Sequence, residues 1–219
     1  MNPSVLLLAD GRFPAGGHAY SAGVESAVDV GDVHDLASLD RYLDGRLALG
    51  VVEAAFAVGA VGAAGGRLDL LDAEFDARVL SPRLRTVSRR LGRQLARAAS
   101  AVWPDAELSR LASSVDGPHQ PVALGVAVGA CGGSPADAAS ISLHHLAAAA
   151  CTAGVRLLGL DPLAVAAVQA RALDRHIVSA DVVERWSTTS PGELPALGGT
   201  LTELLGERHG EWDARLFVA

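Results

Sequence analysis

The chain has 219 residues, half of them hydrophobic, which is enough for a sizeable core in one domain. Its formal net charge of −7 gives no overall positive field to draw it onto nucleic acid, so nucleic-acid binding is not expected. All 18 basic residues are arginines. This excludes reactions that need a lysine amine, such as Schiff-base formation, and phosphate binding by a P-loop lysine.

Cysteine use and hydropathy bear on the compartment. Cys131 and Cys151 are the only cysteines, too few for a disulfide scaffold, and their small neighbours predict two buried thiols. The apolar stretch 5–9 follows no basic segment and is too short for a signal peptide, which predicts the cytoplasm. Residues 47–66 carry one charge, Glu53, but their Ala, Gly and Val content predicts a buried helix rather than a membrane span.

Taken in chain order, the apolar residues recur at intervals of three and four, and no segment alternates as a strand does. Helix starts are marked by Ser or Asp followed by proline, at positions 81, 134, 161 and 190. The sequence therefore predicts an all-α fold, a single-domain bundle of roughly eight to ten helices over residues 1–219. The expected helices are 18–30, 36–63, 67–78, 82–103, 105–114, 119–131, 135–158, 162–186 and 193–209.

Charge is concentrated in one expected helix. Seven arginines and no acid occur between Asp76 and Asp105. Four of these arginines, at positions 85, 89, 93 and 97, are spaced by four and share a helix face. Either acids of the same chain neutralise this row, or it docks an acidic surface of another protein.

The patterns of known catalytic and metal sites are weak or missing. Gly11 and Gly16 have the outer spacing of a phosphate loop, but Gly17 and His18 stand where Lys and Ser or Thr should follow. Adjacent His144 and His145 point about 100° apart on a helix and rarely bind one ion together. No Gly-x-Ser-x-Gly nucleophile elbow is present. We therefore expect no enzyme activity, no cofactor and no stable metal site.

The features that remain suit contact with other proteins. Residues 10–25, DGRFPAGGHAYSAGVE, place four glycines before a helical pattern, so backbone shape matters there. The chain ends in an apolar segment, Leu216, Phe217 and Val218, after Arg215. This tail either packs on its own core or becomes buried in a partner.

The segments Phe13-Pro14-Ala15-Gly16 and Ser21-Ala22-Gly23-Val24-Glu25 resemble the N-terminal signature of the urease accessory protein UreF family. Arg156-Leu157 and the closing Arg215-Leu216-Phe217 are similar to later segments of that family, so the resemblance runs along most of the chain. Two places depart from it. Tyr20 stands where histidine is frequent, and Gly159-Leu160-Asp161 replaces the usual Pro-Leu-Gly-Gln.

The resemblance implies an all-helical, usually dimeric adaptor. It would join a UreD (UreH) protein and recruit the GTPase UreG, so that nickel is delivered to apo-urease. An alternative is a chaperone that carries nickel on its own histidines. The residues that the resemblance assigns to partner binding are Pro14, Gly16, Ser21, Gly23, Glu25, Arg156, Arg215, Leu216 and Phe217.

Overall fold

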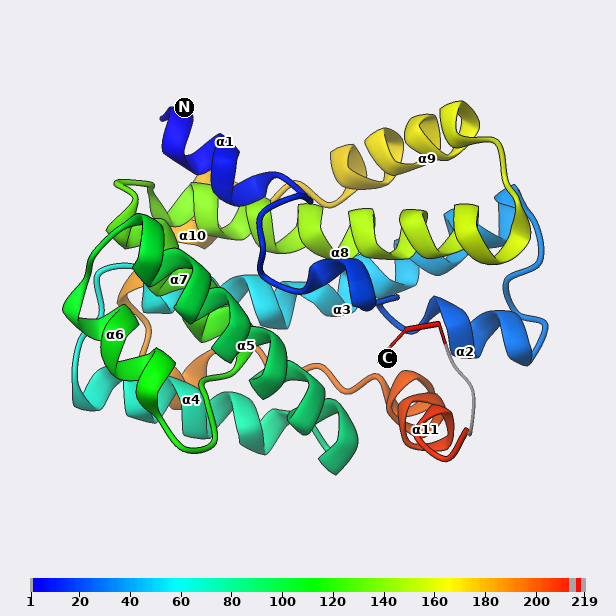
Figure 1. The fold of residues 1–219 in the computed structure, drawn as a ribbon. Coiled ribbons are helices and arrows are strands. Elements are labelled where there is room, and N and C mark those ends of the chain that lie inside the picture. The colour runs from blue at the N-terminus through cyan, green and yellow to red at the C-terminus, as the bar shows by residue number, and fades with distance from the viewer. Residues whose placement is uncertain (1, 213–215, 218–219) are drawn as a thin grey trace.

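The computed structural model describes residues 2–212, 216 and 217, and these residues form helices and loops without a strand (Figure 1). The predicted all-α class is confirmed. Eleven α-helices are present over this part of the chain, slightly more than the eight to ten expected. They are α1 (Pro3–Ala9), α2 (Val24–Asp29), α3 (Leu36–Ala60), α4 (Gly66–Arg78), α5 (Pro82–Val102), α6 (Ala106–Ser113), α7 (Gln120–Ala130), α8 (Pro135–Leu158), α9 (Pro162–Arg175), α10 (Ala180–Thr188) and α11 (Thr200–His209), with short 3₁₀ turns at Gly17–Ala19 and Pro191–Glu193.

The long helices α3 and α8 lie side by side at the centre and run antiparallel (Figure 1). Small residues let neighbouring helices approach closely. A Cβ on Gly125 of α7 would lie 2.1 Å from the backbone oxygen of Ala57 in α3, so only glycine permits this crossing. Apolar faces of α3, α5, α7 and α8 fill the core around these contacts.

Most of the helix starts read from the sequence are confirmed. The Ser81 hydroxyl accepts a hydrogen bond from the amide of Leu84 at the start of α5. At the start of α8, Ser134 and Asp137 form a complete capping box. Asp161 caps α9 through its carboxylate. These caps satisfy amides that the first turn of a helix leaves without partners.

Some expected boundaries were wrong. The single helix expected over 162–186 is interrupted after Arg175, where Arg175 and His176 both bond to Asp44 of α3. A new helix begins after Ser179, whose hydroxyl bonds to Asp181. Helix α1 was missed, and the helix expected over 18–30 begins only at residue 24.

The helix expected over 193–209 begins at residue 200, because Arg78 holds the preceding segment in another conformation. The guanidinium of Arg78 donates to the carbonyl oxygens of Gly192, Leu194 and Pro195 at 3.0–3.1 Å. Those carbonyls are therefore engaged across the fold rather than within a helix. The Ser190-Pro191 pair starts only a 3₁₀ turn.

The structure bears on two expectations from the sequence, the absence of a membrane span and the burial of the two cysteines. One helix among the described residues, α8, is long and apolar enough to cross a membrane, and half of its apolar window is buried inside the molecule. A core helix of a soluble protein passes the same test. Cys131 and Cys151 are both buried and unpaired, as expected. Burial raises the pKa of the Cys151 thiol to about 12, which keeps it protonated.

Gly45 offers a simple test of the helix description. It lies on the exposed side of α3, and a Cβ there would meet nothing within 4 Å. Gly45→Ala should raise the free energy of unfolding by about 0.5–1 kcal/mol, because alanine restricts the unfolded chain and suits a helix interior. Urea denaturation measures this. Gly125→Ala is the contrasting variant and should be destabilising, since its Cβ has no room.

Candidate partner-binding site

The glycine-rich segment before α2 folds into a turn that needs its glycines. Gly16 and Gly23 have φ angles of +80° and +88°, a region that side chains disfavour. A Cβ on Gly23 would lie 2.5 Å from the Tyr42 hydroxyl, which instead donates to the carbonyl oxygen of Ala22. Ser21 is fully buried, whereas Pro14 is exposed. The turn thus fixes the start of α2 and the position of Glu25.

The Glu25 carboxylate is the centre of this site, and it is only 7% exposed. It accepts hydrogen bonds from the backbone amides of Leu216 (2.7 Å) and Phe217 (3.1 Å). The buried His209 of α11 donates to it through Nε2 at 2.8 Å. Groups of the same chain therefore occupy the carboxylate in this structure.

The end of the chain packs on its own body. Phe217 is 2% exposed and joins the apolar cluster around α3 and α8. The guanidinium of Arg156, at the end of α8, lies 4.7 Å from the centre of the Phe217 ring, within the range of a cation–π contact. Leu216 remains 59% exposed. Arg215, also assigned to partner binding from the sequence, lies outside the described residues.

The structure therefore brings five of the nine assigned residues together. Ser21 contacts the amide of Glu25, and Glu25, Arg156, Leu216 and Phe217 form the tail contact. Gly23 shapes the turn that supports them. Pro14 and Gly16 lie earlier in the same segment, where a Cβ on Gly16 would overlap the side chain of Gln94 in α5. Sequence reasoning missed His209, which the spacing of 184 residues from Glu25 could not reveal.

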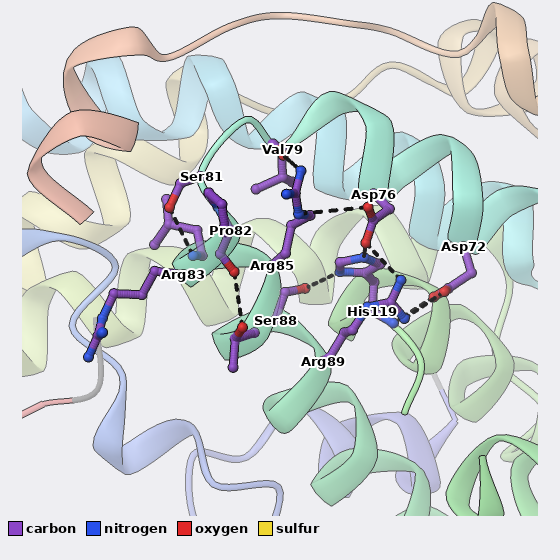
Figure 2. A network of polar contacts seen from close by, with 12 residues as sticks. Asp72, Asp76, Val79, Ser81, Pro82, Arg83, Arg85, Ser88, Arg89 and His119 are labelled. Carbon is purple, nitrogen blue, oxygen red and sulfur yellow. Dashed lines mark hydrogen bonds and ion pairs between the residues drawn. The ribbon is translucent and has the colours of Figure 1, made fainter. Parts of the chain in front are cut away.

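Most of the arginine row is neutralised within the chain. Arg89 bonds to Asp72 and Asp76 of α4 at 2.8 Å (Figure 2). It also donates to the carbonyl oxygen of Gly117 at 2.7 Å. Arg85 pairs with Asp76 and bonds to the carbonyl of Val79, as Figure 2 shows. Arg93 donates to the carbonyl oxygen of Val115. The row thus anchors α5 to α4 and to the loop before α7, and Arg97 alone of the four is exposed.

His119 extends this network into the core. It is fully buried, and its Nε2 lies 2.9 Å from Asp76 while its Nδ1 lies 3.0 Å from the Ser88 hydroxyl. Burial lowers the pKa of His119, so the neutral imidazole is favoured. Both ring nitrogens have partners, which makes His119 a structural link between α4, α5 and α7.

The histidines do not gather into a metal site in the part of the chain that the structure describes. Over that part, no group of three or more His, Cys, Asp or Glu side chains is arranged to hold an ion. His119 and His209 are held by carboxylates of the same chain. His144 and His145 lie side by side with ring centres 6.1 Å apart, as expected for neighbours on a helix.

His145 gives the fold a predictable pH dependence. Burial lowers its pKa to about 4, below the ordinary value of 6.5. Between these two pH values the unfolded chain takes up a proton that the folded chain does not, so stability falls as pH drops. His145→Gln should flatten the loss of unfolding free energy between pH 6.5 and 4 in urea titrations. Curves for the two proteins that stay parallel over this interval would contradict the assignment.

Fold and site together define an all-helical protein in which no His, Cys, Asp and Glu side chains of the described residues are grouped to hold a metal ion. The comparisons agree. The family profile of UreF matches residues 33–173. A urease accessory protein UreF of Mycolicibacterium vanbaalenii is 38% identical over 99% of this chain and 98% of its own length. UreF proteins of Mycobacterium sp. strain JLS and Mycobacterium tuberculosis are 37% and 33% identical, over 99% and 98% of this chain and 98% and 97% of their own lengths.

The chain belongs to the UreF family of urease accessory proteins. This is a non-catalytic, chaperone-type family, so the chain is not an enzyme, and it works with other urease maturation factors. The predicted family is confirmed. The profile match begins after the glycine-rich turn and ends before the tail, whereas the relatives align over both.

Proposed function

We propose that this chain acts in the cytoplasm as a single helical domain and serves as an adaptor of urease maturation. It binds a UreD (UreH)-type protein and recruits the GTPase UreG, and the assembly inserts nickel into apo-urease. GTP chemistry belongs to UreG, which fits a chain without lysine. We also propose that the chain is a homodimer in this assembly, as the family likeness implies.

The observation that carries the proposal is the tail contact on Glu25. Two backbone amides and one histidine converge on one buried carboxylate, while Leu216 stays exposed beside it. These bonds hold Leu216 and Phe217 in a fixed position beside the turn. The exposed Leu216 and Arg156 then offer an apolar and a cationic contact next to the ordered turn. This supports a docking site for the UreD-type protein.

Copurification with the UreD-type protein tests the role of the tail. A chain lacking residues 211–219 is expected to capture much less of that protein than the full chain does. Circular dichroism of both chains checks that the helical body is intact. Undiminished capture by the shortened chain would refute the role of the tail and leave the adaptor proposal to rest on other surfaces.

The alternative, a chaperone that carries nickel on its own histidines, finds less support. His119 and His209 are engaged by Asp76 and Glu25, and His144 and His145 have no third ligand near them among the described residues. One stoichiometric nickel ion retained by the purified chain after dialysis would favour this alternative over the adaptor.

A further inference from the structure

An apolar groove of about 330 Å³ lies beside the glycine-rich segment. Its walls come from the N-terminal segment 8–20 and from α3, α5 and α8. Leu49 and Val52 of α3, Leu91 of α5 and Ala149 of α8 contribute to the apolar lining. A concave apolar surface with few polar groups is typical of a binding site.

One polar pair lies in this lining, Arg46 and Glu53 of α3. An Nη of Arg46 bonds to Oε1 of Glu53 at 2.7 Å, and the side chain of Arg46 is only 9% exposed. The Nε of Arg46 is buried and has no hydrogen-bond partner among the residues that the structure describes. Buried donors almost always have one, so this N–H is available to a bound acceptor. Because Glu53 already balances the charge, an uncharged acceptor suits the site better than an anion.

Two of the segments that line the groove also carry exposed apolar residues. Leu6 and Leu7 of α1 and Leu197, Leu201 and Leu204 at and before α11 are each 48–63% exposed. Leu8 and Leu197 themselves line the groove. Such an extended apolar surface exceeds what a small molecule would cover and is typical of a protein contact. Of the other charged groups in the lining, Asp10 pairs with Arg12 and Arg78 with Glu74, and Glu203 accepts a hydrogen bond from the backbone amide of Ser81.

We propose that this groove binds an apolar polypeptide segment of another protein, with one carbonyl oxygen of that segment accepting a hydrogen bond from Nε of Arg46. A backbone carbonyl or the carboxamide of Asn or Gln supplies such an oxygen. The inference rests on the proposed adaptor function and adds a second docking site, whose lining does not include Glu25, Arg156 or Phe217.

The test uses the full chain and overlapping 15-residue synthetic peptides that cover the UreD-type protein, UreG and the urease subunits of the same organism. Fluorescence anisotropy measures binding of each peptide. Ala149→Arg fills the groove, and Ala166→Arg places the same side chain on the exposed face of α9 as a matched control. Arg46→Lys keeps a cation beside Glu53 but lacks the Nε donor. Thermal unfolding checks that each variant folds.

We expect at least one apolar peptide to bind, with affinity at least tenfold lower for Ala149→Arg, several-fold lower for Arg46→Lys and unchanged for Ala166→Arg. Equal binding by Ala149→Arg would overturn the proposal. The proposal would also be overturned if the chain captured a full-length partner but bound none of the peptides. That result would still support the adaptor function. If neither a peptide nor a full-length partner binds, both this proposal and the proposed adaptor function are wrong. If Ala149→Arg instead halves the mass in light scattering, the groove holds a second copy and the proposal is wrong.

Discussion

Glu25→Ala is expected to lower the affinity for the UreD-type protein at least tenfold and to release the end of the chain. The substitution leaves the amides of Leu216 and Phe217 and the ring of His209 without their shared acceptor. Each buried donor left unsatisfied costs about 1–3 kcal/mol, and about 1.4 kcal/mol corresponds to tenfold in affinity. Isothermal titration calorimetry measures the affinity, and hydrogen exchange at the two amides reports the release.

Two further variants make this result specific to Glu25. Asp29→Ala removes an exposed carboxylate from the other end of α2 and should leave binding unchanged. Glu25→Gln keeps an acceptor oxygen in a side chain of the same shape. Its affinity for the UreD-type protein should lie between those of Glu25→Ala and Asp29→Ala. Release of the tail in Glu25→Ala with full affinity for the UreD-type protein would show that the tail contact is not part of the docking site.

Asp76→Ala is expected to lower the free energy of unfolding by about 2 kcal/mol at pH 7. Asp76 accepts hydrogen bonds from Arg89 and from the fully buried His119, so both lose a partner when it is removed. Its carboxyl group is about one third exposed, which keeps the cost below that of a fully buried pair. Urea denaturation measures the change.

Asp69→Ala is the matched control on the same helix. Asp69 pairs with Arg110 at the surface and is 64% exposed, so its removal should change stability by less than about 0.5 kcal/mol.

The pH dependence of stability supplies a second check on Asp76. Burial alone would raise the pKa of Asp76, but hydrogen bonds from His119 and Arg89 lower it below 3.8. The stabilisation is therefore present above that pH, and the wild type should lose its advantage as pH falls further. Equal stability of the two variants at pH 7 would contradict the network.

The sequence predicted elements where local chemistry decides the structure. Helices α5, α8 and α9 begin where a Ser or Asp cap precedes proline, since the cap satisfies amides that no other part of the chain can reach. The expected single helix over 162–186 failed because Asp44, more than 100 residues earlier, binds Arg175 and His176 at the break. Residues 194–199 are likewise held by Arg78. Such long-range contacts leave no periodic signal.

The candidate site could likewise be predicted only in part from the sequence. The glycine-rich turn and Glu25 could be found because φ angles near +80° require glycine and leave a pattern in the sequence. The partners of Glu25 could not, because His209 and the tail amides reach it only through the fold. The regular spacing of the arginine row was visible, but its acids on α4 became evident only with the structure. A lone buried residue such as Arg46 gave no signal at all.

We propose that this chain assists urease maturation by binding other proteins, without chemistry of its own. The most direct test is to measure the nickel content of urease produced with its accessory proteins, with and without this chain. We expect nearly full occupancy of the nickel sites when the chain is present and low occupancy when it is absent. Equal nickel content in the two preparations would contradict it.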